Sequence, residues 1–298
     1  MPRATLGNLK FHYQQTGSGP DVVLLHGFTS NLAMWMFSPL IPALSNEFRV
    51  TSYDLRGHGM SDAPPTGYTS AAMAEDFAQL HDALDLGPAY LVGHSFGGVV
   101  GMHAALLYPE KVAGVILSDS YFPGLADLEP NMEQAEVWHP LVAAFRKAGE
   151  ELGDTVDFQR LFDIVARLTK DQLKTIEAEM GTESTRWFSQ MPQLAKTSAA
   201  KESFEVAGLD AAALQQVQQP VVALYDQYSP FQATFEFLTN HLPNAEGDIV
   251  PEARHLALLE NPEGFVERVH YHLRRFSTGG ENTTQVEAPM TKQISTDA

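Results

Sequence analysis

The chain has no cysteine, no long apolar run and few basic residues. The lack of cysteine among 298 residues excludes disulfide bonds, thiolate metal ligands and a cysteine nucleophile. No apolar segment reaches the roughly 18 residues that a membrane-spanning helix needs. Only 19 lysine and arginine residues stand against 37 acidic ones, which gives a formal net charge of −18. Because phosphate backbones and anionic lipids attract basic surfaces, we expect neither nucleic acid nor a membrane surface as a partner.

The beginning of the chain gives an expectation about location. Residues 1–8 lack the apolar core of a secretory signal peptide. We therefore expect a cytoplasmic protein.

Short apolar runs alternate with helical patterns over much of the chain. Between residues 69 and 86, apolar residues recur every three or four positions, which predicts an amphipathic helix. Strands are predicted at 22–25, 48–53, 89–92, 112–117, 221–224 and 249–250. Residues 31–44 are expected to be helical only in part, because Pro39 and Pro42 interrupt them. Strands alternating with helices predict a mostly parallel sheet with helices on both faces.

The alternation stops between residues 121 and 206, where several helical patterns and many aromatic residues occur without a convincing strand. We interpret 122–205 as a helical cap inserted into a core formed by 1–121 and 206–276. Most cap aromatics are expected to form its own core, but Trp138, His139 and Trp187 are candidates for substrate contact, because ligand pockets are rich in aromatic groups. Residues 277–298 are polar and are predicted to be a disordered tail.

A serine flanked by glycines, Ser95, lies in the segment 91–98 and completes the pattern Gly-x-Ser-x-Gly. An apolar run precedes it and a run of small residues follows, which predicts a strand, a sharp turn and a helix. The turn is too tight for neighbouring side chains, so glycines flank the serine. Strain exposes the hydroxyl, and the amino end of the next helix favours negative charge there. Ser95 is therefore the candidate nucleophile.

Two segments upstream of Ser95 add to this pattern. Residues 24–28, Leu-Leu-His-Gly-Phe, follow a predicted buried strand, and residues 54–61 follow the next one. With the serine turn, they resemble the α/β-hydrolase superfamily, in particular its serine esterases, lipases and thioesterases with a helical cap. The resemblance implies an α/β-hydrolase fold: an eight-stranded, mostly parallel sheet flanked by helices. It also implies that the backbone amides of Phe28 and Phe96 form an oxyanion hole, with Phe28 near the substrate.

One of the eleven histidines, His255, follows the last predicted strand and a loop, and a Glu-Asn-Pro step at 260–262 comes after it. This arrangement resembles the late loop of the family, usually Gly-His followed by Glu-x-Pro, although Arg254 replaces the glycine here. His255 is the candidate general base.

The acid that orients the base has two candidates. The family usually places it in a Gly-x-x-Asp turn after the next-to-last strand, but the expected position here is Tyr228, which has no carboxylate. Some members carry the acid after the preceding strand, where this chain has Asp119, 24 residues after Ser95. Asp226 is the rival if the later turn bends differently. We prefer Asp119, because the base needs a third group behind it.

A serine hydroxyl becomes nucleophilic near neutral pH only with a base, an orienting carboxylate and oxyanion donors. The resemblance therefore implies a serine-dependent carboxylic ester hydrolase that cleaves esters, lactones or thioesters through an acyl-enzyme. Carbon–carbon bond hydrolysis by the same residues and a ligand receptor with little turnover are the alternatives. The serine argues against dehalogenase and epoxide hydrolase chemistry, for which the family uses aspartate.

The predicted cap indicates an enclosed, mainly apolar pocket. Such a pocket suits a small hydrophobic substrate, for example one with an apolar acyl group or a large lactone such as a macrolide. The chain has no His-Glu-x-x-His motif and no thiolate pair, so we expect neither a metal nor a cofactor.

Overall fold

An eight-stranded sheet forms the centre of the protein in the computed structural model, which describes residues 1–36, 38–129, 139–153, 155, 157–181 and 186–279. The strands lie in the order β1-β2-β4-β3-β5-β6-β7-β8. β1 and β2 pair antiparallel, β2 pairs antiparallel with β4, and all later pairs are parallel. The eight-stranded, mostly parallel sheet that the sequence predicts is thus confirmed. The strands are β1 (Arg3–Leu6), β2 (Leu9–Thr16), β3 (Asp21–Leu25), β4 (Arg49–Tyr53), β5 (Ala89–His94), β6 (Val112–Ser118), β7 (Val221–Asp226) and β8 (Ala245–Val250).

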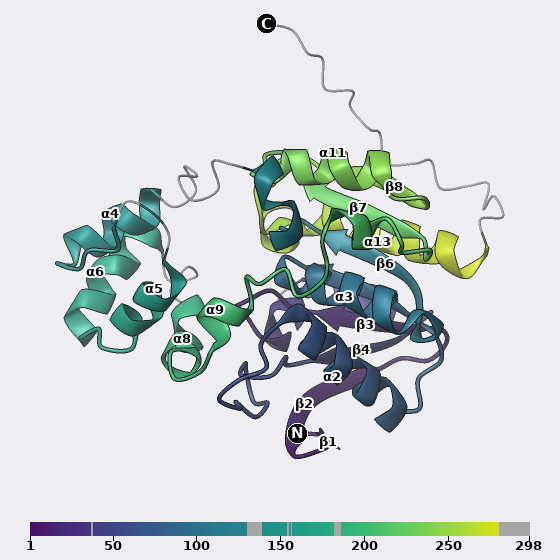
Figure 1. Cartoon of the computed structure of the whole chain (residues 1–298), viewed down its shortest axis with the longest axis horizontal. Coiled ribbons are helices and arrows are strands. Elements are labelled where there is room, and N and C mark those ends of the chain that lie inside the picture. Colours follow the sequence, from purple (N-terminus) through teal and green to yellow (C-terminus); the bar gives the residue numbers. More distant parts are fainter. Residues whose placement is uncertain (37, 130–138, 154, 156, 182–185, 280–298) are drawn as a thin grey trace, which may run out of the picture.

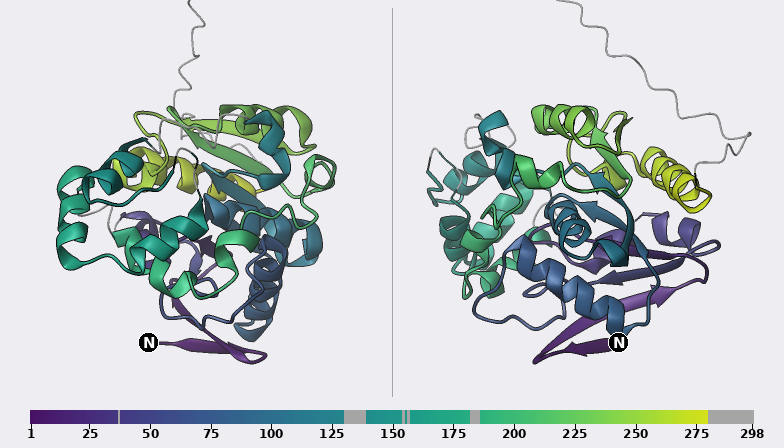
Figure 2. Two further views of the ribbon diagram at one scale, coloured as in Figure 1. Left: turned by 60° about the vertical axis from the view of Figure 1, so that its left-hand side comes forward. Right: turned by 45° about the vertical axis from the view of Figure 1, so that its right-hand side comes forward.

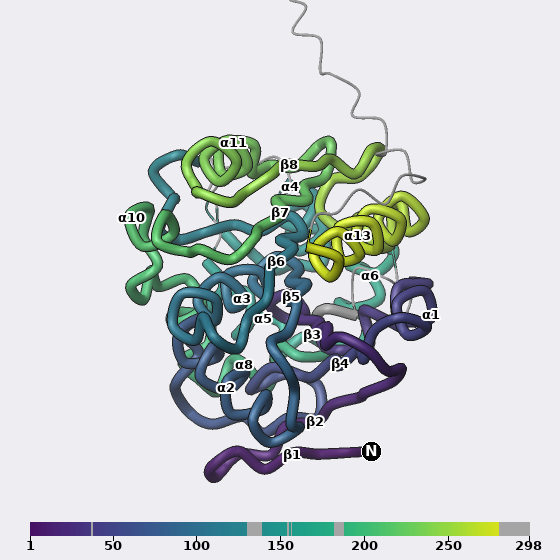
Figure 3. Tube along the Cα trace, turned by 90° about the vertical axis from the view of Figure 1, so that its right-hand side faces the viewer, coloured from purple at the N-terminus to yellow at the C-terminus, as the bar shows by residue number. Residues whose placement is uncertain are grey.

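Helices cover both faces of this sheet (Figure 3). Every residue of β3 is buried, and because successive side chains point to opposite faces, Val23 and Leu25 join one apolar cluster while Val22 and Leu24 join another. The first cluster includes residues of α2 (Ser70–Ala83), α3 (Phe96–Leu107) and α11 (Gln232–His241), and the second includes residues of α1 (Leu40–Leu44), α12 (Ala257–Glu260) and α13 (Pro262–Ser277).

The elements between β6 and β7 are helical in the part of the chain that the structure describes. They are η3 (Pro123–Leu128), α4 (His139–Lys147), α5 (Phe158–Val165), α6 (Lys170–Met180), η6 (Arg186–Ser189), α8 (Met191–Leu194), α9 (Ala199–Glu202) and α10 (Ala211–Leu214). Figures 1 and 2 show α4, α5 and α6 grouped to one side of the sheet, with α8 and α9 between them and the core. The boundaries 122 and 205 remain a prediction.

Polar contacts join the helical segment to the loop that precedes α2. Glu202 Oε2 accepts the backbone amides of Gly67 and Tyr68 at 2.8 and 2.6 Å. The side chain of Gln190 accepts the amide of Gly59 at 2.8 Å, and Ser198 donates its amide to the Pro65 carbonyl at 2.9 Å. Because these acceptors satisfy otherwise orphaned loop amides, they fix α8 and α9 on the core.

Three sequence predictions differ in extent from the structure. The predicted helix over 69–86 ends at Ala83, because Asp85 adopts a left-handed conformation with φ 51°. The segment 31–44 divides into η1 (Leu32–Met36) and α1. The last strand begins at residue 245, four residues before the predicted start. The predicted tail, apart from residues 277–279, lies outside the described residues, and no described helix is long and apolar enough to span a bilayer.

Candidate active site

Ser95 occupies the sharp turn between β5 and α3. Its backbone has φ 51° and ψ −120°, a left-handed conformation that costs a non-glycine residue free energy. The turn is held by a hydrogen bond from its amide to the Ser118 carbonyl, at 2.8 Å. A Cβ atom on Gly93 would lie 2.5 Å from the backbone of Gly97, and one on Gly97 would lie 2.2 Å from the Leu25 carbonyl oxygen. The sequence pattern therefore has a steric cause: only glycine fits on either side of Ser95.

The structure brings His255 and Asp119 together. Nδ1 of His255 lies 2.6 Å from Oδ2 of Asp119. The His255 side chain, 28% exposed, follows β8, whereas Asp119 is fully buried after β6. The imidazole ring of His255 also lies 5.0 Å from the ring of His94, the residue before Ser95. Because the carboxyl ends of parallel strands share one edge of the sheet, all of these residues meet there.

Asp119 is held by hydrogen bonds with the end of β7 and by its contact with His255. Its φ of 47° is left-handed, a conformation that aspartate tolerates better than most residues. Its amide donates to the Leu224 carbonyl at 3.1 Å, and its Oδ1 accepts the Asp226 amide at 3.2 Å. With Oδ2 on His255, both carboxylate oxygens have partners, so the side chain has one preferred orientation.

The loop that carries Phe28 faces the serine turn. A Cβ atom on the preceding Gly27 would lie 3.2 Å from Cδ2 of His94 and 3.4 Å from Cβ of Ser95, so the loop packs directly against the serine turn. The Phe28 and Phe96 rings lie 5.9 Å apart. Phe96 is the first residue of α3, and amides of a first helical turn have no acceptor within their own helix. Both predicted oxyanion donors therefore belong to backbone segments that meet at Ser95.

Two buried histidines hold this loop in place. His58 Nε2 accepts the Thr29 amide at 3.2 Å, and His26 Nε2 accepts the Leu55 amide at 3.0 Å. Burial, together with the neighbouring His26, lowers the pKa of His58 to about 3. Burial also lowers the pKa of His26. Both rings are therefore neutral near pH 7, which leaves Nε2 free to accept, and each Nδ1 lies 2.8–2.9 Å from a backbone carbonyl.

Five phenylalanine rings form an aromatic cluster beside the same loop. Its members are Phe28, Phe96, Phe158, Phe162 and Phe204. The Phe28 ring lies within 6.0 Å of each of the other four, and those of Phe158 and Phe204 stack at 4.5 Å. Phe158 and Phe162 come from α5 and lie one helical turn apart, so both rings are on the same face of that helix. This aromatic face packs against the loop that carries Phe28, which we call the oxyanion loop. Phe28, Phe158 and Phe204 are half-buried and leave ring surface open.

Asp226, the rival acid, directs its side chain to a backbone amide beyond His255. Its Oδ2 accepts the Ala257 amide at 3.1 Å. Burial, and then the charges of Asp119 and Glu260, raise the pKa of Asp226 to about 8. This shift favours the uncharged form of Asp226 at neutral pH.

The predicted substrate contacts in the cap have different outcomes. Trp138 lies outside the described residues, and Trp187 lies in η6 with a side chain that is also outside them. His139 begins α4 and is exposed. Reasoning from sequence passed over Phe204, and it noted Phe158 and Phe162 only as cap aromatics. The spacing of the last two, four residues apart, was the available signal for a shared face.

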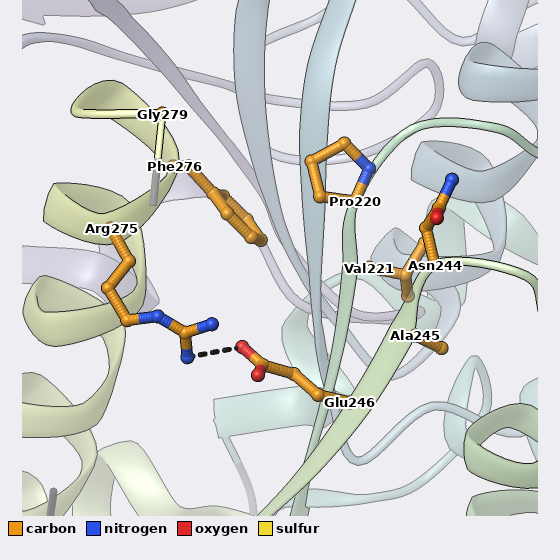
Figure 4. A pocket seen from close by; sticks show the side chains of 8 residues that line it. All are labelled: Pro220, Val221, Asn244, Ala245, Glu246, Arg275, Phe276 and Gly279. Carbon is orange, nitrogen blue, oxygen red and sulfur yellow. Dashed lines mark hydrogen bonds and ion pairs between the residues drawn. The ribbon is translucent and has the colours of Figure 1, made fainter. Parts of the chain in front are cut away.

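A surface pocket of about 410 Å³ lies at the amino ends of β7 and β8, opposite the edge that carries His255 and Asp119 (Figure 4). It is lined by the first residues of β7 and β8 and by the end of α13, where Arg275 pairs with Glu246 at 2.7 Å. Val221 lines this pocket at one end of β7, whereas Asp226 ends the same strand beside Asp119. The pocket is therefore separate from the candidate site. Among the described residues, no group of three or more His, Asp or Glu side chains is arranged to hold a metal ion.

Comparison with known proteins identifies a family for the sequence. The sequence model of the family described as alpha/beta hydrolase fold matches residues 20–262. Among curated relatives, 2-(acetamidomethylene)succinate hydrolase of Mesorhizobium japonicum is 42% identical over 117 residues. That match covers 39% of this chain and 41% of the relative, which is less than half of either protein.

Two solved structures resemble the whole chain. A thermophilic esterase from Thermogutta terrifontis is 26% identical with a TM-score of 0.65, and the match covers 93% of this chain and 99% of that one. The enol-lactonase from Burkholderia xenovorans LB400 is 24% identical with a TM-score of 0.64, and the match covers 92% of this chain and all of that one (100%). At this identity the second likeness concerns the fold alone.

Proposed function

Because the chain belongs to the α/β-hydrolase fold family, we propose that it hydrolyses carboxylic esters, lactones or thioesters through Ser95, His255 and Asp119. The observation that carries the proposal is the 2.6 Å contact between His255 Nδ1 and Asp119 Oδ2, beside the strained turn that presents Ser95. A buried carboxylate behind an imidazole fixes its tautomer and stabilises the imidazolium, which is what an activated serine requires.

The reaction proceeds in two halves. His255 Nε2 takes the proton of Ser95 as its Oγ attacks the acyl carbonyl carbon, and the amides of Phe28 and Phe96 donate to the resulting oxyanion. The tetrahedral intermediate collapses when His255 returns the proton to the leaving alcohol or thiol, which leaves an acyl-enzyme on Ser95. Water, deprotonated by His255, then attacks the ester carbonyl and releases the acid and the free serine.

The aromatic cluster supports a hydrophobic substrate. The half-buried rings of Phe158 and Phe204 lie against Phe28, whose amide is a proposed oxyanion donor, so the acyl group of a bound ester would lie near them. Apolar and aromatic walls of this kind favour an apolar acyl chain or a large lactone over a sugar or phosphate ester. The structural neighbour from Thermogutta terrifontis is an esterase, which agrees with this class of bond.

A fluorophosphonate probe tests the proposal, because it reacts only with an activated serine. We expect rapid labelling at Ser95, confirmed by peptide mapping, and no labelling of Ser95→Ala. Ser45→Ala, at the half-buried residue that follows α1, is the matched control and should label like the wild type. A folded protein that the probe does not label, or that fails on a panel of p-nitrophenyl esters, thioesters and lactones, would contradict the assignment.

A further inference from the structure

Two carboxyl groups capture four successive backbone amides of the segment that carries His255. Glu260 Oε2 accepts the Arg254 amide at 2.7 Å and, at 3.4 Å, the amides of His255 and Leu256. Asp226 Oδ2 accepts the next amide, that of Ala257, at 3.1 Å. We call residues 254–257 the histidine loop. Residues 254–256 precede α12 and Ala257 is its first residue, so these amides have no acceptor in a strand or within their own helix, and the two carboxyl groups supply acceptors instead.

Asp226 also contacts the other member of the His255–Asp119 pair. Its backbone amide donates to Asp119 Oδ1 at 3.2 Å. Asp226 is fully buried at the end of β7, whose parallel pairing with β6 fixes the height of both strand ends. One residue therefore touches Asp119 through its backbone and the histidine loop through its side chain.

We propose that Asp226 is a positioning residue that aligns His255 with Asp119 by tying the histidine loop to the carboxyl end of β6. This proposal rests on the proposed function, because alignment matters only if His255 and Asp119 act together. Asp226 touches no reacting atom, so its effect passes through the other two residues.

The charge state of Asp226 suits this role. A second carboxylate beside Asp119 would compete with it for the imidazolium and would repel it across the sheet edge. Among the described residues, Asp226 Oδ1 is buried and has no hydrogen-bond partner, an arrangement that would penalise an ionised oxygen. The raised pKa of about 8, caused by burial and then by Asp119 and Glu260, agrees with this geometry. The neutral carboxyl accepts the Ala257 amide and leaves the negative charge to Asp119.

The surroundings of Asp226 define how the site should respond to pH. The charged groups that act on its carboxyl group are Asp119, which follows β6, and Glu260 of α12, and the neighbouring strand β8 places Val250 opposite it. Above about pH 8, Asp226 ionises beside two carboxylates, and the repulsion should loosen the histidine loop. We therefore expect wild-type turnover to fall above about pH 8. The fall should be absent in Asp226→Asn, because asparagine does not ionise.

Three variants separate positioning from general stability. Asp226→Ala removes the acceptor of the Ala257 amide, and we expect kcat to fall about 10- to 100-fold with little change in KM, as for a catalytic group that is slightly misplaced. Asp226→Asn keeps an uncharged acceptor, so it should restore most of the turnover and hold it above pH 8. Asp248→Asn is the matched control, because Asp248 is a buried carboxylate of β8 that pairs with His272 rather than with the histidine loop. It should change the melting temperature without changing kcat.

A readout without substrate completes the test. The Nδ1 proton of His255 should give a downfield proton resonance when it bonds to Asp119, present in the wild type and Asp226→Asn and broadened by exchange in Asp226→Ala. The proposal is overturned if Asp226→Ala keeps wild-type kcat and this resonance, or if the pH profiles of the wild type and Asp226→Asn superimpose between about pH 6 and pH 10. A wild type whose Ser95 the fluorophosphonate does not label would instead overturn the proposed function, whatever Asp226 does.

Discussion

His255 Nδ1 and Asp119 Oδ2 lie 2.6 Å apart although 136 residues separate them along the chain. The pairing depends on strand order. β6 and β7 are neighbours, β7 and β8 are neighbours, and all three are parallel, so the segments after them emerge at the same edge. Asp119 follows β6, His255 follows β8, and the side chain and amide of Asp226 at the end of β7 lie between them.

Removal of the nucleophile should abolish turnover. We expect Ser95→Ala to lower kcat on an activated ester by on the order of a millionfold, because no other group can form the acyl-enzyme. Stopped-flow or single-turnover assays of p-nitrophenol release measure this loss. Circular dichroism should show an unchanged fold, because only one oxygen atom is removed. A loss below about tenfold would mean that another residue attacks the substrate.

The two candidate acids can be distinguished by matched amide substitutions. Asp119→Asn should lower kcat by about 10⁴-fold, because the amide cannot stabilise the imidazolium and favours the wrong His255 tautomer. Asp226→Asn should cost far less, because the uncharged form of Asp226 is already favoured at neutral pH. The comparison requires kcat for both variants at one pH near 7. The reverse order of effects would make Asp226 the acid.

The oxyanion loop should depend on His58. His58→Ala removes the acceptor of the Thr29 amide, and Thr29 holds a left-handed φ of 62° that needs such support. We expect kcat to fall about 10- to 100-fold because the Phe28 amide loses its alignment. His103→Ala serves as the control, since His103 is also buried but bonds to Ser70 Oγ at 2.9 Å. Equal effects of both substitutions on kcat would point to general destabilisation.

Acyl-chain preference should depend on the aromatic cluster. Phe204→Ala removes the ring that stacks on Phe158 at 4.5 Å and opens the wall beside Phe28. We expect KM for long-chain p-nitrophenyl esters to rise about tenfold or more, with a smaller change for the acetate. Phe237→Ala, which removes a half-buried ring stacked on His241 in α11, should leave the whole series unchanged. A uniform change across chain lengths would separate the cluster from acyl binding.

Stability should decrease as pH rises through the pKa of His272. Burial lowers this pKa, but hydrogen bonds with Asp248 and Glu246, at 2.9 Å for Asp248, more than offset burial and raise it above 6.5. The folded state therefore holds the proton more tightly than the unfolded state. Its stabilising contribution is complete below about pH 6.5 and is lost as the pH rises through the raised value.

Melting temperatures measured in steps of pH test this effect. His272→Gln should flatten the decline on the alkaline side of pH 6.5. His270→Gln is the control, because His270 lies on the same helix but pairs with Glu47, whose side chain is 38% exposed, against 10% for Asp248. The acidic side is governed by other groups: Glu47 and Glu246 have lowered pKa values, through their hydrogen bonds with Arg274 and His272, and their contributions disappear only at acidic pH. Parallel curves for His272→Gln and the wild type would contradict the assignment.

The sequence predicted most of the sheet, because β3, β5, β6 and β7 contain short apolar runs typical of buried strands, and β4 combines β-branched and aromatic residues that favour a strand. It predicted β8 poorly. Glu246 and Asp248 interrupt the apolar pattern there, and their partners, Arg275 and His272, come from α13. Such a strand lacks the apolar pattern that would reveal it in the sequence, because its polar residues are stabilised by partners from a distant segment.

The serine turn was a local feature that the sequence determined by itself, whereas the candidate base rested on the resemblance of its loop to that of a family. Glycine is required at 93 and 97 by backbone atoms within a few residues or in the adjacent strand, so steric need appears directly as a motif. The pairing of His255 with Asp119, the raised pKa of Asp226 and the ring cluster around Phe28 appear only in the tertiary structure. They depend on burial and on distances between segments more than 100 residues apart, as in the 107-residue separation of Asp119 and Asp226, and neither quantity is written in any short stretch of the chain.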